Sequence, residues 1–211
     1  MRKLPVYLVL DTSGSMNGEP IEAVKNGVQV LLSTLRQDPH AMETAYLSVI
    51  TFDSTAQQLL PLTDLASMQM PDMKASGTTA LGGALELVTQ CIAREVKRTT
   101  AEEKGDWKPL VFLMTDGAPT DDWQKALATY KSTKVGLTVA CAAGHGADTG
   151  ILKQITDTVV SLDTADSTTI RAFFKWVSSS ISTGSQKIEE GGKEISGASE
   201  LPPPPPEINL L

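Results

Sequence analysis

The sequence predicts a three-layer α/β fold, with a mostly parallel central sheet and helices on both of its faces. Short apolar runs alternate along the chain with segments whose apolar residues recur at helical spacing. The first run, Val6–Leu10, is apolar at every position, as in a strand covered on both faces. Because parallel strands need crossover connections, this alternation places helices above and below the sheet.

The expected elements follow in order. After Val6–Leu10, a helix is predicted from Ile21 to Leu35, with Pro20 just inside its start. Residues 57–62 predict one short antiparallel edge strand, limited by Pro61. Residues 63–79 predict a long loop. Further strands are expected at 46–52, 110–114, 135–142 and 159–162, and further helices at 81–96, 121–131, 149–155 and 170–181. Thr120 is the expected cap of the helix at 121–131.

A change in composition predicts where the domain ends. From Thr183 the chain is dominated by Gly, Ser, Glu and Lys, and Pro202–Pro206 are consecutive prolines. Such a segment offers little to a core, so we expect a domain over residues 1–182 and a flexible tail over residues 183–211. The proline run fits either a polyproline ligand for an SH3-like groove or a plain spacer.

Composition excludes several classes of protein. The chain is 41% hydrophobic and 20% charged, as in globular domains, and its net charge of -7 disfavours nucleic acid and anionic membranes as partners. No segment approaches the ~20 apolar residues of a membrane helix. Cys91 and Cys141 lie in apolar segments and are expected to be buried free thiols. With no recognisable leader, we expect a cytoplasmic protein.

Three polar clusters are expected at one edge of the sheet. They are Asp11–Ser15 after the first strand, Gly77–Thr79 before the helix at 81–96, and Thr115–Gly117 after the strand at 110–114. A hard cation such as Mg²⁺ prefers oxygen ligands and keeps some of its waters. Serine and threonine hydroxyls with two compensating carboxylates would suit such an ion.

These clusters resemble the metal-ion-dependent adhesion site of von Willebrand factor type A (VWA) domains. Asp11–Ser15 resembles its Asp-x-Ser-x-Ser core, and the segment 113–117, Leu-Met-Thr-Asp-Gly, resembles its third element. The segment Thr79–Leu85 resembles its threonine element, whose Ala-Leu pair selects Thr79 as the metal threonine, with Thr78 as the fallback. The resemblance runs from about residue 4 to residue 182 and implies a Rossmann-like VWA fold.

The resemblance also implies a ligand set. Ser13, Ser15 and Thr79 would bind the cation directly, whereas Asp11 and Asp116 would act through water. The expected ion is Mg²⁺, with Mn²⁺ or Ca²⁺ as alternatives. Weak neutral ligands leave the ion electrophilic, so an Asp or Glu of a partner protein would complete its shell. This implies a non-enzymatic scaffold or adaptor.

Within the family, the chain resembles the small bacterial proteins of the tellurite-resistance (TerY-like) group. Its segment 5–16, Pro-Val-Tyr-Leu-Val-Leu-Asp-Thr-Ser-Gly-Ser-Met, carries the resemblance, together with Cys141–Gly144 and the proline-rich tail. That group implies a role in tellurium resistance and stress response, with kinase-like or phosphatase-like protein partners from the same operon.

Two rival hypotheses stay open. Asp11 follows the first strand, as the nucleophile of some Mg²⁺-dependent phosphohydrolases does, but Ser13 stands where those enzymes place a second carboxylate. The other rival is a structural subunit with an empty metal site. His40 and His145 are expected in loops, which argues against a serine–histidine–acid triad. Asp121 and Asp122 are expected to be first-turn helix residues rather than rim residues of the metal site.

Overall fold

Seven strands form one sheet in the order β3-β2-β1-β4-β5-β6-β7 in the computed structural model, which describes residues 2–211. The strands are β1 (Leu4–Asp11), β2 (Ala45–Phe52), β3 (Ala56–Asp64), β4 (Leu110–Thr115), β5 (Leu137–Ala143), β6 (Val159–Leu162) and β7 (Asn209–Leu210). The α-helices are α1 (Glu19–Leu35), α2 (Pro39–Thr44), α3 (Leu81–Glu95), α4 (Gln124–Lys131), α5 (Thr149–Ile155) and α6 (Ser167–Gly191). Two 3-10 turns, η1 (Gly14–Met16) and η2 (Ala198–Glu200), complete the set.

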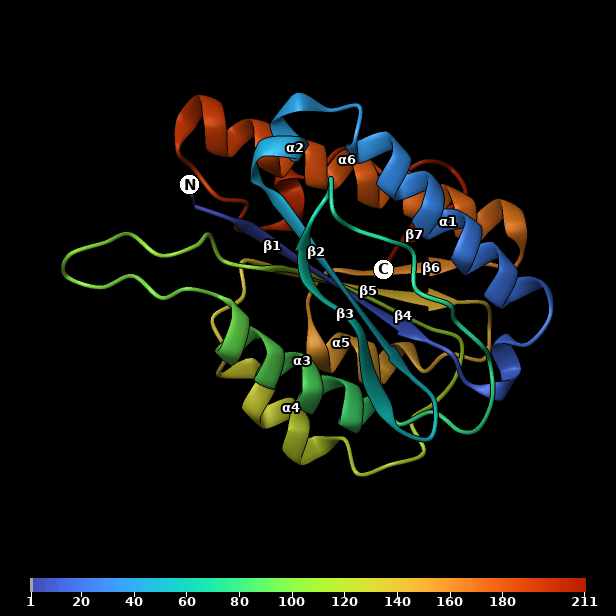
Figure 1. The fold of residues 1–211 in the computed structure, drawn as a ribbon. Helices are drawn as coiled ribbons and strands as arrows, with labels where there is room; N and C mark the ends of the chain where they lie inside the picture. Colours follow the sequence, from blue (N-terminus) through green and yellow to red (C-terminus); the bar gives the residue numbers. More distant parts are fainter. Residues whose placement is uncertain (1) are drawn as a thin grey trace.

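The helices form a layer on each face of the sheet. Figure 1 shows α1, α2 and α6 over one face and α3, α4 and α5 over the other. Strand β1 is buried along its whole length, and its side chains alternate between the two cores. Leu8 and Leu10 belong to the α1–α6 side, whereas Tyr7 and Val9 belong to the α3–α4 side. The predicted three-layer, mostly parallel α/β fold is therefore confirmed.

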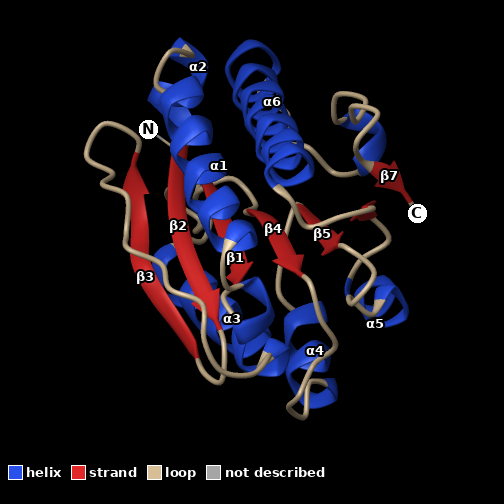
Figure 2. Cartoon of the chain, turned by 90° about the vertical axis from the view of Figure 1, so that its right-hand side faces the viewer, coloured by secondary structure: helices blue, strands red, loops and turns tan. Residues whose placement is uncertain are grey.

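The strand order reverses its direction beside β1. From β1 the chain moves through β2 to β3 in one direction, and β4 to β6 then continue on the other side of β1. The connection after β1 leads to α1 on one face, and the connection after β4 leads to α4 on the opposite face (Figure 2). Because these two connections lead to opposite faces, the carboxyl ends of β1 and β4 lie at the switch point where α/β sheets bind ligands.

Both outer strands of the sheet are antiparallel to their neighbours. The edge strand expected at 57–62 lies within β3, which is nine residues long and pairs with β2 through two register shifts. The Ser48 hydroxyl donates to the Leu60 carbonyl (2.8 Å) at this irregularity. At the opposite edge, β7 pairs antiparallel with β6, and no strand was expected there.

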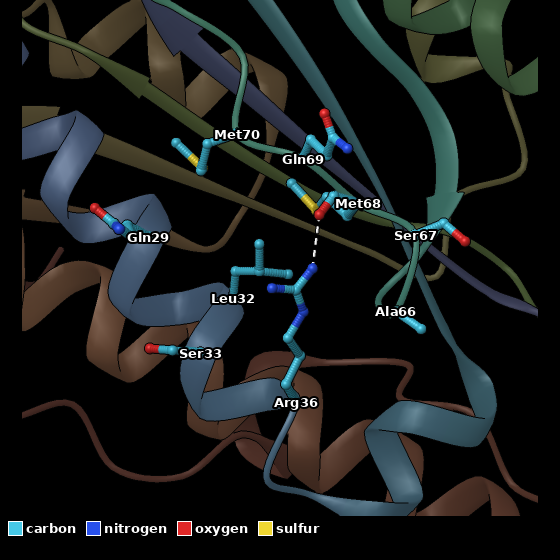
Figure 3. Close-up of a pocket in the computed structure, with 9 residues that line it drawn as sticks. All are labelled: Gln29, Leu32, Ser33, Arg36, Ala66, Ser67, Met68, Gln69 and Met70. Atoms are coloured by element: carbon cyan, nitrogen blue, oxygen red, sulfur yellow. Dashed lines mark hydrogen bonds between the residues drawn. The ribbon is translucent and has the colours of Figure 1, made fainter.

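The loop that follows β3 is hydrogen-bonded to Arg36, at the end of α1. Arg36 reaches from the end of α1 and donates to the carbonyls of Leu65 (2.8 Å) and Met68 (2.6 Å), as Figure 3 shows for Met68. Met68 and Met73 are 2% and 1% exposed and belong to the core. These methionines therefore fill the core beneath the loop. Cys91 and Cys141 are buried free thiols, as expected.

The expected flexible tail over residues 183–211 is wrong. Helix α6 continues to Gly191, Ile195 and Ile208 are 2% and 5% exposed, and β7 extends the sheet. The Trp176 indole donates to the Pro202 carbonyl at 2.8 Å, so the proline run is docked at its first residue. The average composition of residues 183–211 is polar, but isolated isoleucines within this segment are buried in the core. Within residues 2–211, no helix combines the length and apolarity that crossing a membrane requires.

Replacing Ile208 tests whether this C-terminal segment stabilises the domain. Ile208→Ala removes a buried side chain, so we expect a loss of about 2 kcal/mol in the free energy of unfolding and a fall of several degrees in Tm. Leu210→Ala is the matched control, because Leu210 is 61% exposed. Urea unfolding measures both; equal stability of the Ile208→Ala variant and the wild type would contradict the packing role.

Candidate metal centre

The five predicted site residues lie at the carboxyl ends of β1 and β4 and in the loop before α3. Asp11 is the last residue of β1, Ser13 and Ser15 lie in the turn that follows, Asp116 follows β4, and Thr79 precedes α3. The turn after β1 is joined to the loop before α3 by two backbone hydrogen bonds. Gly14 donates to the Gly77 carbonyl at 3.0 Å and Ser76 donates to the Thr12 carbonyl at 2.9 Å.

Asp11 is a buried carboxylate held by two donors. It is 1% exposed, and its Oδ1 accepts the backbone N–H of Ser13 at 2.7 Å. Its Oδ2 accepts the hydroxyl of Thr115, the last residue of β4, at 2.6 Å. Asp11 thus fixes the turn that follows it and ties β1 to β4. The sequence places Thr115 in the third polar cluster, but its hydrogen bond to Asp11 was not predicted.

The two serines lead from Asp11 to Asp116. The hydroxyls of Ser13 and Ser15 are 3.1 Å apart, and the Ser15 hydroxyl donates to Asp116 Oδ1 at 2.8 Å. Burial raises the pKa of the Asp116 carboxyl, and the negative charge of nearby Asp11 raises it further, against the hydrogen bond from Ser15. The site therefore holds two carboxylates whose ionised forms a bound cation would stabilise.

Thr79 and Thr78 face different ways. Thr79 is 7% exposed, and its hydroxyl lies 3.6 Å from where a Cβ on Gly117 would stand. Thr78 is exposed, and both its backbone N–H and its hydroxyl are hydrogen-bonded to the Ser54 hydroxyl (3.1 and 3.2 Å). The structure thus places the Thr79 hydroxyl beside the Asp116 loop and directs Thr78 toward the β2–β3 connection.

The donor atoms fit a hard divalent cation. Ser13, Ser15 and Thr79 offer three hydroxyl oxygens, and Asp11 and Asp116 offer carboxylate oxygens, which are the ligand types that Mg²⁺ prefers. In the described part of the chain, no group of three or more His, Cys, Asp or Glu side chains is arranged to hold a metal. A cation at this site would therefore depend on hydroxyl oxygens as well as on carboxylates.

Acidic residues gather around the site. We define the carboxyl edge as residues 11–19, 53–56, 75–80, 116–123, 144–148 and 163–166. It contains nine of the chain's 25 acidic residues and none of its 18 Lys and Arg residues. In the described structure, none of these nine acidic residues takes part in an ion pair. Where their carboxylates accept hydrogen bonds, the donors are neutral N–H and O–H groups. Their negative charge is therefore not compensated by protein cations.

The carboxyl edge also contains His145, Asp121 and Asp122. His145 is exposed in the β5–α5 loop, where Gly146 packs so closely on the Asp116 carbonyl that a Cβ would lie 2.6 Å from it. Asp122 is exposed. Asp121 does not begin its own helix, because α4 starts at Gln124, and its carboxylate instead accepts N–H groups of α3. The expected helix start and the Thr120 cap are therefore wrong.

A family model, the von Willebrand factor type A domain, matches residues 6–176. The chain belongs to this family. VWA domains form a family of metal-dependent protein-interaction modules and are generally not enzymes. The match runs from Val6 in β1 to Trp176 in the first half of α6 and includes all five candidate site residues.

Solved VWA structures share the fold at low sequence identity. A von Willebrand factor type A protein from Catenulispora acidiphila superposes with a TM-score of 0.66 at 19% identity, covering 86% of this chain and 43% of that one. Proximal thread matrix protein 1 from the mussel byssus, in a structure with a zinc-occupied MIDAS motif (metal-ion-dependent adhesion site), superposes with a TM-score of 0.61 at 20% identity. The superposition covers 84% of this chain and 48% of that one. An uncharacterized protein of Synechocystis sp. is 34% identical over 123 residues, which are 55% of this chain and 26% of that protein. The chain thus spans under half of each of these relatives.

Removing the Thr115 hydroxyl tests its role in holding Asp11. Thr115→Val leaves a buried carboxylate without one donor, so we expect a loss of about 2 kcal/mol of stability in chelator-treated protein. Thr115→Ser keeps the hydroxyl and loses a buried methyl group, for an expected loss of about 1 kcal/mol. Urea unfolding compares the variants; if Thr115→Val is as stable as the wild type, the hydrogen bond to Asp11 is not a structural requirement.

Proposed function

We propose that this VWA domain is a metal-dependent protein-interaction module of the scaffold or adaptor type. Ser13, Ser15 and Thr79 would bind Mg²⁺ directly, and Asp11 and Asp116 would act through bound water. An Asp or Glu side chain of a partner protein would then complete the coordination shell. The observation that carries the proposal is the hydrogen-bonded chain from Asp11 through Ser13 and Ser15 to Asp116, with the Thr79 hydroxyl beside the Asp116 loop.

The character of the ligands supports recognition of an acid. Neutral hydroxyl oxygens transfer less charge to the cation than carboxylates do, so the ion keeps a strong attraction for an anionic ligand. Mg²⁺ also retains waters, and one of these can be replaced by a partner's carboxylate. Mn²⁺ or Ca²⁺ would accept the same oxygen donors.

The phosphohydrolase hypothesis has weaker support. A nucleophilic aspartate needs a free oxygen directed at the substrate, whereas both oxygens of Asp11 accept hydrogen bonds and the residue is 1% exposed. Ser13 also stands where such enzymes place their second carboxylate. Hydrolysis of a generic phosphoester that disappears in Asp11→Asn would restore this hypothesis.

The biological setting stays a prediction. Resemblance of the segment 5–16 to the tellurite-resistance group supports a place in a bacterial stress-response system. Kinase-like or phosphatase-like proteins of the same operon would then be partners. A cytoplasmic location and an Mg²⁺-loaded state belong to the same proposal.

Comparing the two neighbouring threonines tests the ligand set. Thr79→Ala should remove most of the stabilisation that Mg²⁺ gives the wild type, which is about 2.7 kcal/mol at a concentration 100 times Kd. Thr78→Ala is the control and should keep the full effect, because its hydroxyl is bonded to Ser54. Thermal unfolding with Mg²⁺ and with chelator gives the measurement. The reverse result would assign Thr78 as the ligand, and no Mg²⁺ effect on the wild type would favour a structural subunit with an empty site.

Partner capture tests the functional proposal itself. The wild-type domain should retain a specific protein from native lysate in Mg²⁺ and release it in chelator. Ser13→Ala should fail to retain that protein, because one cation ligand is missing, whereas Thr78→Ala should retain it. Equal capture by the Ser13→Ala variant, or capture that resists chelator, would contradict a metal-mediated contact.

A further inference from the structure

The loop between β4 and α4 is bonded directly to Thr79. The Thr79 backbone N–H donates to the Thr120 hydroxyl at 3.0 Å, and the Thr120 backbone N–H donates to the Thr79 carbonyl at 2.9 Å. The two residues therefore hold each other through a pair of hydrogen bonds in opposite directions. This pair fixes the peptide groups on both sides of Thr79, from which its side chain projects.

The next residue of the same loop holds the start of α3. The N-cap of α3, Ala80, has no side-chain acceptor to offer. Instead the Asp121 carboxylate accepts the N–H groups of Gly82 (3.0 Å) and Gly83 (2.9 Å), one on each oxygen. A carboxylate at this end of a helix satisfies free N–H groups and interacts favourably with the helix dipole. Thr79 is thus flanked by two anchors from one loop.

The close contact between the first turn of α3 and the β4–α4 loop depends on Gly82. A Cβ on Gly82 would lie 2.8 Å from the Asp122 carbonyl oxygen and 2.8 Å from Trp123 Cα, which are backbone atoms that cannot move aside cheaply. A Cβ on Gly83 would meet nothing closer than 3.7 Å. The first turn of α3 therefore lies directly on the β4–α4 loop only because residue 82 has no side chain.

We infer that Thr120 and Asp121 are positioning residues of the proposed metal site, acting through Thr79. Asp116 begins the loop that contains both of them, four residues before Thr120. One short loop therefore supplies a carboxylate to the site and holds the threonine of a different segment beside it. Two further backbone bonds hold this segment, from Leu81 N–H to the Thr79 carbonyl (3.0 Å) and from Ala80 N–H to the Asp53 carbonyl (2.7 Å). The inference rests on the proposed cation at this site.

Calorimetric titration of the full chain with Mn²⁺ or Mg²⁺ tests the inference. Thr120→Val removes the acceptor for Thr79 N–H, so we expect a roughly five- to tenfold increase in Kd. Thr120→Ser keeps the acceptor and should stay within about twofold of the wild type. A merely structural role would lower the unfolding temperature and leave Kd of the folded protein unchanged, which would overturn the inference.

A double-mutant cycle shows whether Thr120 acts through Thr79. In a Thr79→Ala background, Thr120→Val should change Kd by less than about twofold, because the hydroxyl that it positions is absent. Independent, multiplying effects on Kd would contradict the inference. If the wild type binds no cation, the proposed function fails; if it binds and Thr120→Val binds equally well, only the positioning role fails.

A further pair of variants tests the contact between α3 and the β4–α4 loop without removing a polar group. Gly82→Ala forces the β4–α4 loop away from α3 and should raise Kd for Mn²⁺ several-fold in protein that remains folded. Gly83→Ala adds the same methyl group where there is room and should leave Kd unchanged. Unaltered affinity in a folded Gly82→Ala variant would show that the contact does not govern Thr79.

Discussion

The double hydrogen bond of the Asp11 carboxylate organises the site. One oxygen fixes the turn that carries Ser13 and Ser15, and the other accepts the hydroxyl of Thr115 at the end of the neighbouring strand. Because Asp11 ends β1 and Thr115 ends β4, this contact joins the connections that leave the sheet toward opposite faces. The serines of the turn, and through Ser15 the Asp116 carboxylate, are therefore placed relative to Asp11.

Much of the fold follows from local patterns in the sequence. The apolar run in β1 indicates burial on both faces, and helical spacing of apolar residues indicates α1, α3 and α6. The clusters after β1 and β4 could be placed at one edge because parallel strands end there, and resemblance to the VWA family added Thr79 to them. Five residues separated by up to 105 positions could thus be grouped before any contact was known.

The features that could not be predicted depend on contacts between distant segments. Asp121 resembles a residue that begins its own helix, but its carboxylate is bonded to α3, about forty positions earlier in the chain. The C-terminal segment is polar on average, yet single residues such as Ile195 and Ile208 are buried against the domain. Local propensity and average composition carry no information on either contact, because both depend on which surface the folded chain brings near.

The separation of charge gives the molecule a polarity that its net charge conceals. With nine unpaired acids at the carboxyl edge, the remaining 16 acidic and 18 basic residues leave the rest of the chain at about +2. The protein is thus an electric dipole with its negative pole at the carboxyl edge. Its electric field attracts cations toward Asp11 and Asp116 before they make contact. At physiological ionic strength, salt screens this attraction beyond ~8–10 Å. The net charge of -7 is therefore the sum of about -9 at the carboxyl edge and about +2 over the rest of the chain.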